Sequence, residues 1–422
     1  MCAGLETMLR CNIPIYRYYY SDTNPIARTL AVTRLRTLQE RFPSLLPSSA
    51  FQHVFMMPQD INEVDSESLL KTGANNGRQW LVIAGWECQD LSNAGSGRGL
   101  KGQHSSTFFP LINVCASLQL LQPKLTPAFV FENTSIQTHR DNKIAIDDFN
   151  EICAIIGQPV LLDAARFGSG AHRLRNFWTN LANPTQILTV AEAIQRNPNL
   201  TATMYLDPNR IPLPVDKADQ KPFYPCNKVG LPRAVFPTLV SFSPSMAFRD
   251  MGPGMIYDNK LEQYLQPNVT ERERMMGYLE DSTFADKLTT NDRQTIIGKA
   301  MDANCLEYFF TICVALYENK ITQSSSIQFT APTTSCVTAL TTTFKELHSL
   351  PQTERWWHDP NKITDSSGLV IEKVGVGHAL AGIGHDDIAE IDSYLLAADK
   401  HIEADVWGEP IFLNYLKTKE YP

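Results

Sequence analysis

Residues 80–92 read WLVIAGWECQDLS, and a second apolar stretch, AFVFENT, follows at 128–134. Each opens with a continuous apolar run, which is typical of a short strand buried on both faces. Helical patterns lie after them, at 108–121 and 146–156. Short buried strands alternating with helices predict an α/β fold, in which a doubly wound and mostly parallel sheet carries helices on both faces.

Further runs of the same kind extend this alternation. Residues 13–21 (IPIYRYYYS), 53–57 and 159–162 predict three more strands, and 25–42 predicts a helix. Ligands of such sheets bind beyond the carboxyl ends of the strands. Polar residues follow four of the predicted strands, so we expect them to meet at one rim of the sheet: Ser21 and Asp22, Gln59 and Asp60, Glu87 to Gln89 with Cys88 between them, and Glu132 with Asn133.

Composition and charge divide the 422 residues into regions. The content of 43% hydrophobic and 19% charged residues excludes a disordered, collagen-like or multi-span membrane chain. Residues 182–262 interrupt the alternation as an irregular, Pro- and Asn-rich lobe, and 270–310 return to a helical pattern. Most of the net charge of −8 lies in residues 318–422, which hold eight Lys and Arg against fifteen Asp and Glu. The near-neutral remainder is compatible with a local basic surface for phosphates.

The nine cysteines include no CxxC pair, which favours reduced thiols in an intracellular compartment and argues against a zinc site. Cys88 is a candidate nucleophile because it follows a buried strand and precedes a glycine-rich loop. The alternative is a buried thiol that only packs. Glu132 follows an apolar run, where a carboxyl held protonated could donate to a ring nitrogen. An ordinary polar strand end is the alternative for Glu132.

At this point the motifs, in their order, resemble those of the cytosine-5 DNA methyltransferases, most closely the eukaryotic de novo class. WLVIAGWECQDLS resembles the strand and loop of the catalytic cysteine, and AFVFENT resembles the Glu-Asn-Val motif. AHRLRNFWTNL (171–181) is similar to the arginine motif, and TERERMMGY (270–278) and RQTIIGKAM (293–301) are similar to the last two motifs. GLETMLRCNIPIYRYYYSD (4–22) resembles the end of the cofactor motif and the strand after it.

The resemblance implies methyl transfer from S-adenosylmethionine to carbon 5 of a cytosine flipped out of DNA, in the nucleus and without a metal. Cys88 would attack carbon 6 of the base, and Glu132 would hold ring nitrogen 3 and the amino group. Arg173 and Arg175 would position the base and the loop. The resemblance also implies that Ser92 and Arg98 lie in the loop that closes over the base. Gly4 and Leu5 would contact the cofactor, Asp22 would bind its ribose, and Asp60 with Ile61 would receive its adenine.

The same resemblance implies the first two of three regions. Residues 1–181 and 263–317 would form the catalytic methyltransferase domain. Residues 182–262 would form the target-recognition region. Residues 318–422 lie outside the resemblance, and their composition predicts an acidic C-terminal extension as the third region. The sequence of residues 182–262 does not indicate which target this region would recognise.

The chain departs from the family pattern in two places. It opens inside the cofactor motif, which predicts truncation of the first strand, or a permutation in which residues 368–384 supply that strand. Glu87 stands where the family has proline before the cysteine, and a carboxylate beside a thiol is expected to raise the thiol pKa and slow attack. Two alternatives stay open: a catalytically silent relative that binds DNA or a partner methyltransferase, and a methyltransferase acting on RNA.

Overall fold

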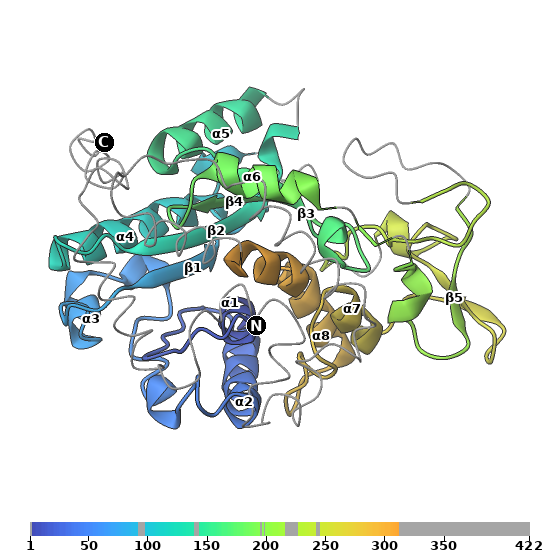
Figure 1. The fold of residues 1–422 in the computed structure, drawn as a ribbon, viewed down its shortest axis with the longest axis horizontal. Coiled ribbons are helices and arrows are strands. Elements are labelled where there is room, and N and C mark those ends of the chain that lie inside the picture. Colours follow the sequence, from blue (N-terminus) through green and yellow to red (C-terminus); the bar gives the residue numbers. More distant parts are fainter. Residues whose placement is uncertain are drawn as a thin grey trace.

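The computed structural model describes residues 2–311, apart from 92–97, 139–142, 195, 198, 216–226 and 242–244. Its central element is a four-stranded sheet in the order β1-β2-β4-β3 (Figure 1). The pair β1–β2 is parallel, whereas β4 is antiparallel to both of its neighbours. Three strands therefore share one direction, which fits the predicted α/β class. The strand bounds are β1 Leu81–Gly85, β2 Ala128–Thr134, β3 Val160–Asp163 and β4 Leu174–Thr179.

Helices pack around this sheet, and the three clearest helical predictions, at 25–42, 108–121 and 146–156, are confirmed. A further helical segment, residues 303–311, follows the last labelled helix. None of the helices within the described ranges combines the length and apolar character needed to cross a bilayer. The helix bounds are α1 Ala3–Arg10, α2 Pro25–Arg41, α3 Ser66–Lys71, α4 Phe108–Leu121, α5 Lys143–Ile156, α6 Pro184–Ala193, α7 Val269–Met275 and α8 Thr290–Lys299.

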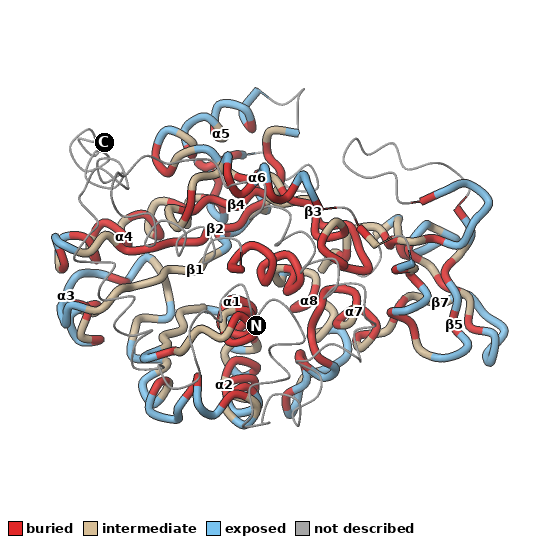
Figure 2. The backbone as a smooth tube through the Cα atoms, viewed as in Figure 1, coloured by how far each residue is buried: buried red, intermediate tan, exposed pale blue. Residues whose placement is uncertain are grey.

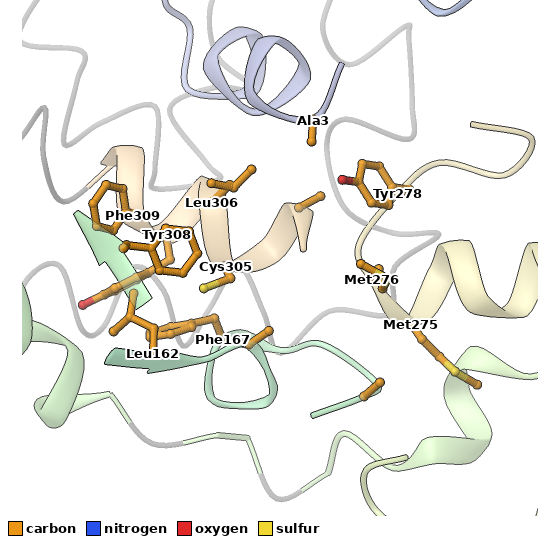
Figure 3. Packing of buried hydrophobic residues seen from close by; sticks show 14 of the residues in the cluster. Ala3, Leu162, Phe167, Met275, Met276, Tyr278, Cys305, Leu306, Tyr308 and Phe309 are labelled. Atoms are coloured by element: carbon orange, nitrogen blue, oxygen red, sulfur yellow. The ribbon is translucent and has the colours of Figure 1, made fainter. Parts of the chain in front are cut away.

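Alternation along β2 assigns its side chains to two separate cores. Phe129 and Phe131 pack with residues of α4 and α5 in one core, whereas Val130 packs in the other, together with residues 303–311. This follows from the two-residue period of a strand. Helix 303–311 is buried along its whole length (Figure 2). It lies between the start of α1 and the sheet (Figure 3), and its Tyr308 ring stacks on Phe167 with centroids 4.0 Å apart.

Local capping explains where several helices begin. The Asn24 side chain accepts a hydrogen bond from the Ile26 amide at 2.9 Å, and Pro25 occupies the first helical position of α2. Helices α7 and α8 begin with capping boxes formed by Asn268 with Glu271 and by Thr289 with Asp292.

The predictions of strands at 13–21 and 53–57 were wrong. Residues 13–21 form an extended segment without a strand ladder, and 53–57 form turns. The amides of Tyr18 and Tyr20 donate to the carbonyls of Ala50 and Val54 at 2.7 and 2.8 Å. That neighbouring segment holds a short 3₁₀ helix, Ser48–Phe51, so the pairing cannot repeat regularly. An aromatic, β-branched run indicates a half-buried extended chain, but it does not supply a strand partner.

The irregular lobe at 182–262 contains α6, which lies beside β4 and packs on β3, and most of a small antiparallel sheet, which lies at the far end of the molecule from α4 (Figure 1). Its strands are β5 Arg210–Pro212, β6 Ile256–Asp258 and β7 Gln263–Leu265. Because β7 pairs with β6, this small sheet continues past residue 262. The lobe also shares its apolar core with the large sheet, since Ile187 and Phe236 belong to the same cluster as Val130. The predicted extension at 318–422, with its segment 368–384, lies outside the described residues.

Candidate active site

The segment that carries Cys88 begins directly after β1. Trp86 anchors it, because the buried indole ring contacts the rings of Phe108 and Trp178 at centroid distances of 5.1 and 5.3 Å. The Leu91 amide donates to the carbonyl of Cys88 at 3.0 Å and closes a turn. Cys88 is half-buried, and its sulfur is a free thiol. The thiol therefore lies at the carboxyl end of β1, where the sequence predicted it.

Glu132 lies on β2 directly beside the end of β1, in register with Gly85. A Cβ at Gly85 would meet Glu132 Oε2 at 3.2 Å, so the small residue leaves room for the carboxylate. The next residue, Asn133, donates from Nδ2 to the carbonyl of Trp86 at 3.0 Å and joins the end of β2 to the cysteine segment. The structure thus brings the predicted thiol and the predicted carboxyl to one rim.

Arg175 approaches the same carboxylate from β4. Its Nε lies 2.9 Å from Glu132 Oε1, and both side chains are largely buried. Burial, followed by the charge of Arg173, lowers the pKa of Arg175 to about 10, although Glu132 and Cys88 act in the opposite direction. The predicted pair of arginines therefore reaches the predicted carboxyl and thiol.

Arg173 is held at the start of β4 by its backbone and by its guanidinium. The Arg173 amide donates to Asp163 Oδ1 at 3.0 Å, and Arg173 Nη1 donates to the carbonyl of Gly298 at 3.3 Å. Asp163 Oδ2 also lies 2.9 Å from His172 Nδ1. Burial alone would raise the pKa of Asp163, but the His172 contact and the backbone amides hold it below its usual value. Asp163 therefore acts as a charged anchor for the arginine motif.

The electrostatic environment of the Cys88 thiol is mixed. Burial is the largest influence and raises the thiol pKa. Arg175 and Arg173 lower it, and Glu132 raises it. The thiol form is therefore dominant at rest, and the two arginines supply the charge that favours the thiolate.

Two buried polar atoms of this cluster accept or donate no hydrogen bond within the described part of the chain. They are Glu132 Oε1 and Arg173 Nε. Buried polar groups of folded proteins nearly always have partners. Glu132 Oε1 does lie within ion-pair distance of Arg175 Nε, so that arginine is its charged partner. A carboxylate with further acceptor capacity and a guanidinium N–H suit a ligand that offers both a donor and an acceptor.

The structure gives the Glu87 carboxylate a surface partner, and Glu87 is not among the charged groups with the largest effect on the thiol pKa. The charged groups that shift the pKa of Cys88 are Arg175, Glu132 and Arg173. The Glu87 carboxylate instead lies 2.9 Å from His104 Nδ1 at the surface. The expectation that Glu87 raises the thiol pKa stays a prediction.

Two acidic turns lie next to each other in the N-terminal part of the chain. The Ser21 hydroxyl donates to the carbonyls of Pro58 and Gln59 at 2.6 and 3.1 Å, which brings the turn of Asp22 beside that of Asp60. Asp22 accepts from the Asn24 amide at 2.8 Å and from the Tyr20 hydroxyl at 3.0 Å. Asp60 accepts from the amide of Asn62 at 2.9 Å and is followed by Ile61 at the start of a short 3₁₀ helix. All three predicted residues are half-exposed.

Gly4 and Leu5 have packing positions in α1. A Cβ at Gly4 would meet Ile83 Cδ1 at 2.7 Å, so the glycine allows α1 to lie against β1. Leu5 is 2% exposed and belongs to an apolar cluster with residues of α2. Contact of these two residues with a cofactor stays a prediction, and the structure shows what they do for the fold.

The two loop residues have different outcomes. Ser92 lies outside the described residues. Arg98 is exposed and precedes a short 3₁₀ helix, Gly99–Lys101, whose Gly99 amide donates to the carbonyl of Asp90 at 3.0 Å. A contact of either residue with a base stays a prediction.

A thiol, a carboxyl and two arginines thus converge at one rim of an α/β fold. Residues 51–213 match the family model described as C-5 cytosine-specific DNA methylase. This part of the chain, which holds Cys88, Glu132, Arg173 and Arg175, is therefore similar to that family. Among the curated proteins, none matches the chain in sequence.

Solved structures of three methyltransferases are similar to the chain at low identity. The Dnmt2 methyltransferase of S. pombe is 14% identical, covers 74% of this chain and 95% of its own, and gives a TM-score of 0.45. The Entamoeba histolytica methyltransferase EhMeth is 11% identical, with coverage of 74% and 94% and a TM-score of 0.38. A mutant of Spodoptera frugiperda DNMT2 is 12% identical, with coverage of 74% and 96% and a TM-score of 0.42.

Members of this family use S-adenosylmethionine as the methyl donor. The acidic turns fit parts of that molecule, because each oxygen of the half-exposed Asp22 carboxylate keeps acceptor capacity for a ribose hydroxyl. Asp60 and Ile61 offer a carboxylate beside an apolar side chain, which suits an aminated ring. Among the described residues no group of His, Cys, Asp and Glu is arranged to hold a metal ion.

Sequence reasoning did not single out three residues that shape the site. Gly85 leaves space for Glu132, and Asp163 with His172 fixes the backbone of Arg173. Asp163 directly follows the predicted strand at 159–162, so the rule that residues after strands form the rim was a usable signal for it. Nothing in the local sequence indicates the contact between Gly85 and Glu132, which depends on strand register.

Proposed function

We propose that this chain methylates carbon 5 of cytosine in DNA through a covalent adduct at Cys88, with the base flipped out of the duplex. The observation that carries the proposal is the arrangement of Cys88, Glu132, Arg173 and Arg175, in which Arg175 pairs with the Glu132 carboxylate and all three charged groups act on the thiol pKa. A carboxyl and guanidinium groups around a thiol suit the amidine-like edge of cytosine, which presents an acceptor nitrogen and a donor amino group. The description of the matching family favours DNA as the substrate.

The chemistry follows from what these side chains can do. Cys88 sulfur, once deprotonated, forms a bond to carbon 6 of the ring, and Glu132 donates a hydrogen bond or proton at nitrogen 3 to take up the displaced electron pair. Arg175 holds Glu132 and, with Arg173, stabilises the thiolate. S-adenosylmethionine, when bound, supplies an electrophilic methyl group. Loss of the proton from carbon 5 and elimination of the cysteine then restore the aromatic ring and the free thiol.

The remaining parts of the proposal rest on the resemblance to the de novo class. Residues 182–262 would contact the target DNA, and the nucleus would be the compartment of action. In Figure 1 the small β5-β6-β7 sheet of this region lies beyond β3, on the opposite side of the molecule from α4.

Covalent trapping tests the proposal directly. The full chain is mixed with S-adenosylmethionine and duplex DNA containing 5-fluorocytosine, whose fluorine blocks the elimination step, and denaturing gels report the adduct. We expect a cofactor-dependent adduct that is absent in Cys88→Ser. The matched control is Cys153→Ser, which removes another half-buried free thiol, on α5, and should leave the adduct unchanged.

A parallel arm with 5-fluorocytosine RNA separates the substrates. An adduct with RNA but not with DNA would show that the chain carries out the same reaction on RNA, and it would overturn DNA as the substrate. No adduct with either nucleic acid would overturn the enzymatic proposal in favour of a silent relative that binds nucleic acid or a partner.

A further inference from the structure

The segment with Cys88 is fastened to a second segment, residues 98–107, by contacts from two acidic residues. Asp90 is buried, and its Oδ2 accepts hydrogen bonds from the amides of His104 and Ser105 at 2.9 and 3.1 Å. The Ser105 hydroxyl donates to the carbonyl of Glu87 at 2.8 Å. These contacts hold the backbone on either side of the cysteine against one short stretch of chain.

A side-chain contact completes this arrangement at the surface. Glu87 Oε2 lies 2.9 Å from His104 Nδ1, with side chains 48% and 49% exposed. Residues 87 and 104 lie on the two sides of the stretch 92–97 that separates the segments in sequence. The contact therefore links Glu87, which directly precedes Cys88, to the segment 98–107.

We propose that Glu87 and His104 form a clasp that positions Cys88 for attack, in place of the backbone restriction that a proline before the cysteine supplies. Proline limits the backbone torsions of its own position and of the residue before it. A side-chain contact that bridges the loop ends achieves a related restriction from outside the backbone. Both residues are positioning residues in this proposal, because they would act on Cys88 through the backbone of the segment that carries it.

The contact can persist in either protonation state of His104. A protonated imidazole pairs with the carboxylate as an ion pair, and a neutral imidazole with its proton on Nδ1 donates a hydrogen bond to it. Three hydrogen bonds surround the contact between Glu87 and His104. The amides of His104 and Ser105 donate to the Asp90 carboxylate, and the Ser105 hydroxyl donates to the Glu87 carbonyl. The clasp therefore depends on the relative position of the Glu87 and His104 side chains more than on the charge of His104.

The inference rests on the proposed function, and the first experiment uses the rate of adduct formation at saturating 5-fluorocytosine DNA. Because an exposed pair is worth little in stability but misplacement of a nucleophile is costly, Glu87→Ala and His104→Ala should each lower this rate about threefold to tenfold. The DNA concentration at half-saturation should stay unchanged. The double variant should be no slower than either single variant, because the two residues act as one unit.

Two rescue variants distinguish positioning from general loss of structure. Glu87→Gln keeps an acceptor for the Nδ1 proton and should retain most of the rate. Glu87→Pro should restore the rate when combined with His104→Ala, because the backbone restriction then replaces the clasp. Glu67→Ala, which breaks a remote exposed pair with Lys71, is the matched control and should have no effect. Additive losses in the double variant, or unchanged rates in both single variants, would overturn the clasp.

A second measurement is independent of the reaction. Hydrogen exchange of the peptide covering residues 86–91 should become faster in Glu87→Ala and His104→Ala, and unchanged exchange would count against the clasp. If the parent chain forms no adduct, the proposed function fails, and the exchange measurement alone decides whether the clasp restrains the segment.

Discussion

Arg175 on β4 holds Glu132 on β2 diagonally across two neighbouring antiparallel strands, with Arg175 Nε 2.9 Å from Glu132 Oε1. In their register Arg175 lies opposite Thr134, and Phe177 lies opposite Glu132. Residues two positions apart on a strand share one face, so the arginine and the glutamate are diagonal neighbours. The sheet therefore fixes the relative position of two groups that are 43 residues apart in the chain.

Removal of the Arg175 guanidinium should impair the reaction more than binding. We expect Arg175→Ala to lower the single-turnover rate of adduct formation about 100-fold, because it releases Glu132 and removes a charge that favours the thiolate. Arg175→Lys keeps the positive charge but loses the planar guanidinium with its several N–H donors. Its rate should therefore lie between those of the parent chain and Arg175→Ala. Equal rates for Arg175→Ala and the parent chain would contradict the assigned role of the pair.

The pH dependence of Cys88 alkylation should report the same charges. Iodoacetamide reacts with the thiolate, and burial raises the Cys88 pKa while Arg175 lowers it. Arg175→Ala should therefore move the midpoint of the alkylation profile upward by about one pH unit.

Mass spectrometry separates Cys88 from Cys153, whose pKa burial raises to about 11. The matched control is Lys71→Ala, an exposed charge on α3 paired with Glu67, which should leave the midpoint of Cys88 in place. A midpoint that falls in Arg175→Ala would show that the arginine does not favour the thiolate.

Stability should fall as pH rises toward neutrality because of Asp302. This carboxyl is buried, accepts from the Ser169 hydroxyl at 2.7 Å and from the Cys305 amide at 3.0 Å, and burial raises its pKa to about 7. A raised folded-state pKa means that its contribution is complete below about pH 4 and is lost as pH rises through about 7.

Asp302→Asn should remove this dependence. The amide oxygen keeps both accepted hydrogen bonds, and no buried charge forms at high pH. The variant should therefore unfold at higher urea concentration than the parent at pH 8, by about 1 to 4 kcal/mol in the free energy of unfolding. Parallel stability curves from pH 4 to pH 8 for the two proteins would refute the assignment.

A buried ion network joins the first two helices and should be costly to break. Glu6 on α1 accepts from Arg10 and from Arg34 on α2, and all three side chains are buried. Burial would raise the pKa of Glu6, but Arg10 and Arg34 together lower it below its usual value. Glu6→Ala leaves two buried cations short of a partner, so we expect a loss of about 3 to 5 kcal/mol in the free energy of unfolding.

The exposed pair of Glu67 and Lys71 provides the comparison. Their atoms are 2.9 Å apart, but both side chains are largely exposed. Glu67→Ala should cost less than about 1 kcal/mol. Urea unfolding of both variants tests the contrast, and similar losses for the two would show that the Glu6 network does not stabilise the fold.

The sequence by itself determined the class of fold and the candidates for the reactive groups. The apolar runs at 80–85 and 128–131 became β1 and β2, and the periodic stretch at 108–121 became α4 with the predicted bounds. Such patterns are local, because burial on both faces of a strand or on one face of a helix requires apolar residues at fixed spacing. Polar residues directly after these runs were therefore predictable members of the site, as Cys88 was.

The tertiary structure decided the pairing of elements and the partners of individual charges. The run at 13–21 has strand composition but remains extended without a ladder, because its neighbour at 45–54 is irregular. Glu87 directly precedes Cys88, and its carboxylate contacts His104, which lies beyond an intervening stretch of chain. Strand partners, register and the direction of a charged side chain depend on distant segments, and local spacing carries no information about those segments.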